Sequence, residues 1–166
     1  MTQRTINDLY PVLFDQTISG DTVIYQVEPR SDGQIGHVTT IFPVMLGPEF
    51  PKTMGHYHVP PHSETYTIKE GTGLIVIQAV DVTGAVTDFQ TIPVTAGTVY
   101  TVPEGYGHLL VNLGASPLVA WDNWDEAWAQ HDYEDVIKHQ GFANYILKGT
   151  PVFTITPNSK YLKIKN

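Results

Sequence analysis

The chain has 166 residues, 42% hydrophobic and 11% aromatic, so we expect one globular domain with a buried core rather than a disordered or collagen-like chain. Its net charge of −8 disfavours nucleic acid and acidic membrane surfaces as partners, because both require a basic protein surface. The chain contains no cysteine, so disulfides are excluded and a metal site must use histidine and carboxylate ligands. It has no apolar run near the ~20 residues of a membrane span and begins without a secretory signal pattern, so a cytoplasmic protein is expected.

Short strands are expected over most of the chain. Residues 9–14 form either a short helix or an arm, and beyond them β-branched and aromatic residues alternate between turns rich in Gly and Pro. Residues 74–80 are almost wholly apolar, which is typical of a strand buried on both faces. This pattern predicts a closed antiparallel barrel or sandwich. The expected strands are residues 22–28, 37–42, 65–69, 74–80, 87–94, 98–102, 109–113 and 118–124.

The pattern changes after the last of these strands. Residues 133–140 are the best helix candidate, because they carry a small apolar face and are followed by a glycine. Two short strands are expected at residues 144–147 and 152–156, and the basic tail 160–166 is expected to be exposed. No repeat or linker divides the chain.

A possible metal site lies in the middle of the sequence. His56, His58 and Glu64 fall within nine residues, and alternation along an extended chain turns both imidazoles to one side. With His108 from a distant strand end, they form a ligand set for Fe(II), Mn(II), Zn(II), Ni(II) or Co(II) that leaves coordination positions open for catalysis. The alternative is that these are ordinary loop or core histidines. His62 is close enough to compete as a ligand but ranks below Glu64.

Two motifs carry a family resemblance. The spacing of Gly97, Pro103, Gly105, His108 and Asn112 matches the second cupin motif in full. The resemblance implies an all-β cupin double-stranded β-helix, that is, a jelly-roll barrel, with a few short helices. It further implies an N-terminal arm (1–21), a metal-binding barrel (22–124) and a C-terminal helix and strands packed on it (125–166), all within one domain.

The first cupin motif is matched with one departure. Gly55, His56 and His58, followed by Glu64 and Gly71, resemble it, but five residues separate His58 from Glu64 where typical cupins have three or four. This longer gap indicates a particular branch of cupins rather than the generic dioxygenases.

That branch resembles the cupin-type glucose-6-phosphate isomerases of archaea and some bacteria. Residues 53–58 are similar to its T-x-G-H-[FY]-H motif, Glu64 and Tyr66 to its E-x-Y, and residues 131–133 to its H-D-Y. A tyrosine that the family has shortly before H-D-Y is missing. Residues 122–125 (Asp-Asn-Trp-Asp) stand in that region and leave room for a different sugar phosphate.

The resemblance implies a sugar-phosphate pocket and its catalytic groups. Glu64 would be the base, or only a metal ligand if the reaction is a hydride shift, and Tyr66 would donate a hydrogen bond or shuttle a proton. Neither motif contains Lys or Arg, so neutral hydroxyl and backbone donors are expected to hold the phosphate. The implied contacts are Tyr25, Thr40, Thr53, Gly55 and Tyr66, with His131 and Tyr133 closing over the sugar. Each also has an ordinary structural reading, as a strand, packing or surface residue.

The expected activity is therefore interconversion of glucose 6-phosphate and fructose 6-phosphate, as in glycolysis and gluconeogenesis. One divalent ion per subunit is expected, with Fe²⁺ ranked first, and a homodimer formed through the N-terminal arm. Two alternatives stay open. One is another cupin enzyme, either an Fe(II) dioxygenase or a different sugar-phosphate isomerase, and the other is a non-catalytic sugar-binding cupin.

Overall fold

The computed structural model describes residues 1–161 of the chain. No helix in that part is long and apolar enough to cross a membrane. The elements in order are β1 (Thr2–Thr5), α1 (Ile6–Leu9), η1 (Tyr10–Val12), β2 (Val23–Pro29), β3 (His37–Ile41), β4 (Tyr57–Val59), β5 (Glu64–Glu70), β6 (Thr72–Val80), β7 (Val86–Thr95), β8 (Val99–Val102), β9 (Gly107–Asn112), β10 (Leu118–Asp122), β11 (Gln130–Asp132), α2 (Glu134–Lys138), β12 (Asn144–Lys148) and β13 (Phe153–Pro157).

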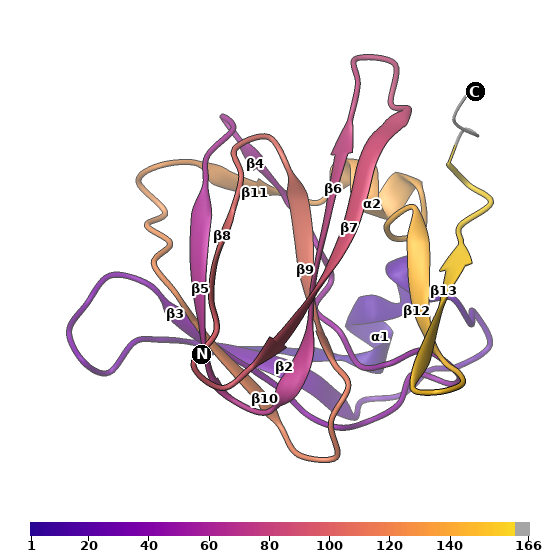
Figure 1. Ribbon diagram of the computed structural model, residues 1–166, viewed down its shortest axis with the longest axis horizontal. Coiled ribbons are helices and arrows are strands. Elements are labelled where there is room, and N and C mark those ends of the chain that lie inside the picture. Colours follow the sequence, from indigo (N-terminus) through magenta and orange to yellow (C-terminus); the bar gives the residue numbers. More distant parts are fainter. Residues whose placement is uncertain (162–166) are drawn as a thin grey trace.

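Two antiparallel sheets enclose the core. One has six strands in the order β1-β2-β3-β10-β5-β8, and the other has three in the order β7-β6-β9 (Figure 1). Two small sheets, β4-β11 and β12-β13, complete the fold. The apolar side chains of both large sheets form one buried cluster. The all-β cupin fold expected from the sequence is confirmed.

Burial patterns explain why the interior is apolar at one end and polar at the other. In β6 the six residues from Gly73 to Gln78 are all buried, because β7 and β9 flank the strand and the other sheet covers its face. In β5 burial alternates, so that Glu64, Tyr66 and Ile68 point inwards. This inward row begins with two polar side chains, and β5 therefore delivers a carboxylate and a hydroxyl to the interior of the barrel.

The N-terminal segment is an integral part of the six-stranded sheet. Its β1 was not expected, because the polar sequence TQRT lacks an apolar face and lies at the sheet edge, paired only with β2. The buried Lys52 ammonium group lies 2.5 Å from the Glu49 carboxylate. Lys52 also donates to the carbonyl oxygen of Val12 at 2.8 Å, and the Phe14 amide donates to Glu49 at 3.0 Å. These contacts fix the segment after η1 to the barrel.

The expected strands are present, with small shifts at their ends. The expected helix is shorter than predicted, because Tyr133 caps it and Gln140 adopts a positive φ of 58°. Gly71 alone joins β5 to β6; its φ is 85°, and a Cβ there would lie 2.5 Å from the carbonyl oxygen of Pro117. Most of the tail 160–166 lies outside the described residues.

Candidate metal centre

Four side chains from separate elements meet at the polar end of the barrel. His56 precedes β4, His58 lies on β4, Glu64 begins β5, and His108 lies on β9. Their ligand atoms all lie within 4.8 Å of one another, and Glu64, His58 and His108 are buried. The sequence therefore predicted which residues the fold brings together.

Backbone pairing positions the two sides of this cluster. His56 and His108 form an isolated antiparallel bridge, in which each backbone amide donates to the other's carbonyl at 3.2 and 3.0 Å. Between His56 and His58, Tyr57 points away and packs over Gly107, where a Cβ would lie 2.5 Å from the tyrosine ring. The alternation expected of His-x-His thus turns both imidazoles towards the cluster.

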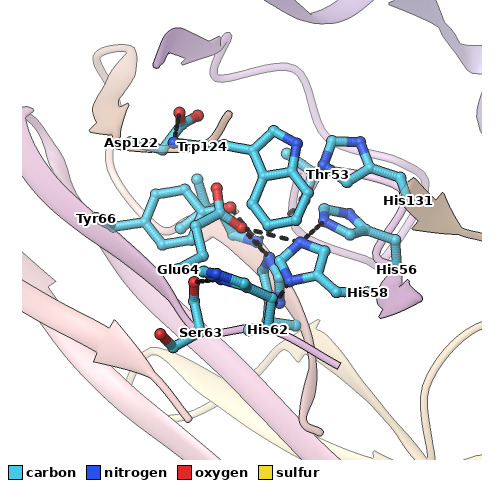
Figure 2. Close-up of polar contacts among 12 residues, drawn as sticks. Thr53, His56, His58, His62, Ser63, Glu64, Tyr66, Asp122, Trp124 and His131 are labelled. Carbon is cyan, nitrogen blue, oxygen red and sulfur yellow. Dashed lines mark hydrogen bonds and ion pairs between the residues drawn. The ribbon is translucent and has the colours of Figure 1, made fainter. Parts of the chain in front are cut away.

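Short contacts join the nitrogen and oxygen atoms of the cluster, as Figure 2 shows. His108 Nε2 lies 2.8 Å from Glu64 Oε2, and His58 Nε2 lies 3.4 Å from the same oxygen. His56 Nε2 lies 3.2 Å from His58 Nε2. Three imidazole nitrogens and a carboxylate oxygen therefore face one another at the centre, so the donor atoms converge on one region.

The protonation states of the cluster suit a divalent cation. Burial, and then the neighbouring His108 and His131, hold the pKa of His56 well below its usual value, so its imidazole is neutral. Burial opposes the charge on Glu64, but hydrogen bonds and charge from His108, with help from His58, hold its pKa well below the usual range. Three imidazoles and one carboxylate therefore fit a divalent transition metal.

A hydrogen bond and an aromatic stack orient His58. Its Nδ1 donates to the carbonyl oxygen of His62 at 3.0 Å, which leaves Nε2 free to act as a ligand. The indole of Trp124 covers the other face of the ring (Figure 2). His62 itself stacks on Trp128, and its Nδ1 donates to the carbonyl of Ser63 at 2.7 Å, so it does not join the cluster.

A cavity of about 360 Å³ opens beside the cluster. Most of the substrate contacts expected from the sequence line it. These residues are Tyr25, Thr53, Gly55, Tyr66, His131 and Tyr133.

Thr40, also expected as a substrate contact, does not line this cavity. In β3 the side chains of His37, Thr39 and Ile41 share the inner face, and His37 and Thr39 line the cavity. Thr40 lies between Thr39 and Ile41 and therefore points to the opposite face of the sheet.

Hydroxyl groups near the cluster remain protonated. Burial, and then the negative charges of Glu64 and Asp122, raise the pKa of Tyr66 well above its usual value. The Tyr66 hydroxyl lies 3.1 Å from His108 Nε2. Thr53 accepts a hydrogen bond from the Leu110 amide at 3.1 Å, and this fixes its side chain at the wall of the cavity. Both groups can present hydrogen-bond donors to a ligand.

The histidine of the H-D-Y motif lies beside the cluster. His131 is on β11, which pairs with β4 so that His131 stands opposite His58. Its ring centroid lies 4.1 Å from that of His56, and burial lowers its pKa to about 4. Gly55 supplies the backbone next to His56, and its φ of 83° and contact with Phe142 leave no space for a side chain.

Sequence reasoning missed several residues of the cavity wall. Asp122 ends β10, and its carboxylate accepts hydrogen bonds from the amides of His37 at 2.8 Å and Trp124 at 3.0 Å. Burial, and then the charge of Glu64, raise its pKa to about 6. Arg4 also lines the cavity. The departure from the family pattern at residues 122–125 was the signal that could have identified Asp122, whereas nothing in the sequence pointed to Arg4.

The facing sheets and the buried histidine–carboxylate cluster define a cupin-type protein with a candidate metal centre. A family model described as glucose-6-phosphate isomerase matches residues 4–161. The chain therefore belongs to the glucose-6-phosphate isomerase family, and the resemblance stated from the motifs is confirmed.

Individual relatives agree with this assignment. The glucose-6-phosphate isomerase of Thermococcus onnurineus is 29% identical over 154 residues, which cover 89% of this chain and 78% of the relative. That of Pyrococcus furiosus is 28% identical over 149 residues, covering 86% and 75%. Among solved structures, an oxalate oxidase matches 52% of this chain and 39% of its own, with a TM-score of 0.43 and 20% identity.

Proposed function

We propose that this protein is a metal-dependent aldose–ketose isomerase that interconverts glucose 6-phosphate and fructose 6-phosphate. The observation that carries the proposal is the cluster of His56, His58, Glu64 and His108, of which His56 and Glu64 line a cavity of about 360 Å³. Such a cavity is large enough for a hexose phosphate. Membership of the glucose-6-phosphate isomerase family supports the choice of reaction.

We assign the chemistry to residues of the cavity wall. His56, His58, Glu64 and His108 would hold the metal, which supplies Lewis-acid polarisation of the sugar oxygens when bound. Glu64 is the proposed base, because its carboxylate is ionised and lies on the wall of the cavity. It would take a proton from one carbon of the C1–C2 pair and return it to the other through a cis-enediol.

Tyr66 is the proposed acid partner of Glu64. Its raised pKa keeps the hydroxyl protonated, so it can donate a hydrogen bond to a sugar oxygen as charge develops there. Tyr25, Thr53, the backbone of Gly55, His131 and Tyr133 are the proposed substrate contacts, since all line the cavity. Buried Trp124, which stacks on His58, helps to exclude water from the ligand cluster.

A coupled assay with fructose 6-phosphate tests this function. Chelated protein should be inactive and should regain isomerase activity with one divalent ion per subunit. We propose Fe²⁺ as the first candidate, with Mn²⁺, Co²⁺, Ni²⁺ and Zn²⁺ as comparisons. Absence of turnover with every metal would refute the function, and oxygen consumption in an electrode would support the dioxygenase alternative instead.

The reaction route can be tested separately from the reaction itself. Turnover in D₂O should introduce deuterium at C1 or C2 of the product, because a proton held by Glu64 exchanges with solvent. A product without deuterium would support a hydride shift, in which Glu64 acts only as a ligand.

We also propose a single folding unit, a homodimer, and a place in cytoplasmic glycolysis or gluconeogenesis. Pairing of β1 with β2 and of β11 with β4 joins the segments 1–21 and 125–166 to the barrel and supports one unit. A single unfolding transition, and a mass of two chains by light scattering, are the expected results.

A further inference from the structure

The cavity contains one strongly basic side chain, and it does not come from either motif. Among the described residues, Arg4 is the only Lys or Arg on the cavity wall. It shares that wall with three acidic residues, Glu64, Asp122 and Glu126. Among the described side chains of the wall, a dianion entering the cavity would therefore meet a fixed positive charge only at Arg4.

Backbone pairing places three strands of the sheet between Arg4 and Glu64. It lies on the edge strand β1, where its Cα is opposite that of Tyr25 on β2. Glu64 lies on β5, at the other side of the same six-stranded sheet, with β2, β3 and β10 between. A hexose 6-phosphate has a matching arrangement, because its C1–C2 pair and its phosphate are at opposite ends of the carbon chain.

The guanidinium group faces the interior hydroxyls. Burial, and then Tyr133, raise the pKa of Tyr25 to about 12, and Arg4 acts in the opposite direction. Arg4 also opposes the rise that burial causes in the pKa of Tyr133. Both tyrosines line the cavity, so Arg4 and two hydroxyl donors converge on one region of its wall.

Arg4 has no carboxylate partner within ion-pair distance among residues 1–161. Arg30, by contrast, is paired with Asp32 at 2.6 Å, and Lys52 with Glu49 at 2.5 Å. The charge of Arg4 helps to lower the pKa of Asp8, but the Asp8 carboxylate accepts hydrogen bonds from the amide and the hydroxyl of Thr5 at 2.7 and 2.8 Å. A half-buried guanidinium without a carboxylate partner keeps N–H donors for an anion.

We propose that Arg4 is the phosphate-binding residue of this isomerase and, with Tyr25 and Tyr133, determines its specificity for phosphorylated sugars. The fork of the guanidinium matches two phosphate oxygens, and the tyrosine hydroxyls donate to the rest. This inference rests on the proposed function for the identity of the sugar. It replaces the expectation from the sequence that neutral donors alone hold the phosphate.

Kinetics of the metal-loaded Arg4→Gln variant test the proposal. Loss of a charged hydrogen-bonding group should raise KM for fructose 6-phosphate about 10- to 100-fold, and should weaken inhibition by inorganic phosphate in parallel, with a smaller change in kcat. Lys148→Gln removes the same charge from an exposed position on β12 and should match the wild type. A KM and a phosphate inhibition constant within twofold of the wild type would overturn the proposal.

A measurement on the wild-type protein avoids any effect of the substitution on folding. The chain contains two arginines, Arg4 and Arg30, so the Nε–H signals in an NMR spectrum of zinc-loaded protein give a site and an internal control. Titration with inorganic phosphate should shift the Arg4 signal and leave that of Arg30 in place. If phosphate binds without shifting Arg4, the assignment fails. If phosphate shifts Arg4 but no metal restores isomerisation, the phosphate site stands and the proposed reaction fails.

Discussion

The indole ring of Trp124 lies almost parallel to the imidazole of His58, with centroids 3.8 Å apart and an angle of 18° between the planes. Trp124 is only 2% exposed. At the edge of the imidazole ring, His58 Nδ1 donates a hydrogen bond to the carbonyl oxygen of His62. One face of a proposed metal ligand is thus covered by an aromatic side chain from the segment where this chain departs from the family pattern. That segment stabilises the site as well as closing it.

Replacing Trp124 by leucine should therefore weaken metal retention. Loss of the stack frees the His58 ring to rotate, and outer-shell changes of this kind cost about 10- to 100-fold in metal affinity. Competition with a fluorescent chelator measures the effect, with His108→Ala as the variant that lacks a proposed ligand. Trp128→Leu is the matched control, because Trp128 stacks on His62 rather than on His58. Equal affinities of Trp124→Leu and wild type would contradict this role.

Replacing Glu64 by glutamine should abolish isomerisation while leaving the barrel folded. The amide keeps the shape of the side chain but cannot accept a proton, so kcat should fall about 10²- to 10⁴-fold. The coupled assay must be run beside elemental analysis, so that lost activity is not confused with lost metal. Glu70→Gln changes an exposed carboxylate on the same strand and should be neutral. Near-normal kcat in metal-loaded Glu64→Gln would remove Glu64 as the base.

Replacing Glu49 by alanine should destabilise the fold strongly. Lys52 is 4% exposed and would be left as a buried charge without its partner, at a cost of about 3–5 kcal/mol in the free energy of unfolding. Urea denaturation measures this change, and Glu104→Gln in an exposed turn is the control. The double variant Glu49→Leu/Lys52→Met should recover much of the loss. Equal instability of the double and single variants would show that the ion pair is not the cause.

Asp122 should make stability decrease as pH rises. Its pKa is raised from 3.8 to about 6 in the folded protein, so between these values the folded state binds more protons than the unfolded state. The stabilisation is present at pH 4 and is lost as pH rises through 6. Asp122→Asn should remove this slope, which is on the order of 1–3 kcal/mol across the window. Unfolding free energies of chelated wild type and variant test it, and parallel pH curves would refute it.

The sequence predicts the strands of the barrel well, because each strand is determined by the pattern of apolar residues within its own short segment. A run such as residues 74–80 is apolar on both faces, and only a strand covered on both sides satisfies it. The residues of the histidine–glutamate cluster were predictable for a similar reason, since His56 and His58 share one side of an extended segment and His108 completes a motif. The cavity wall contains Thr39 rather than the expected Thr40, because a shift of one residue reverses the face of a strand and sequence alone did not determine which face each threonine takes.

The remaining features depend on contacts between distant segments. Arg4 reaches the cavity only because β1 pairs with β2, and the sequence around it has no apolar pattern to indicate a strand. Trp124 becomes an outer contact of the ligand cluster only because β10 ends beside β4 and β11 in the folded chain. Neither the position of Arg4 nor that of Trp124 can be predicted from the spacing of residues along the sequence.

The reciprocal backbone bridge between His56 and His108 has a consequence for assembly of the metal centre. Because amide and carbonyl groups hold these two residues face to face, half of the donor set is in position before any ion arrives. Chelation should therefore leave an apoprotein that keeps its fold, and different ions can be exchanged through one scaffold. Inserting a single residue between Gly105 and His108 would turn the imidazole out of the barrel and leave a folded jelly roll without a metal.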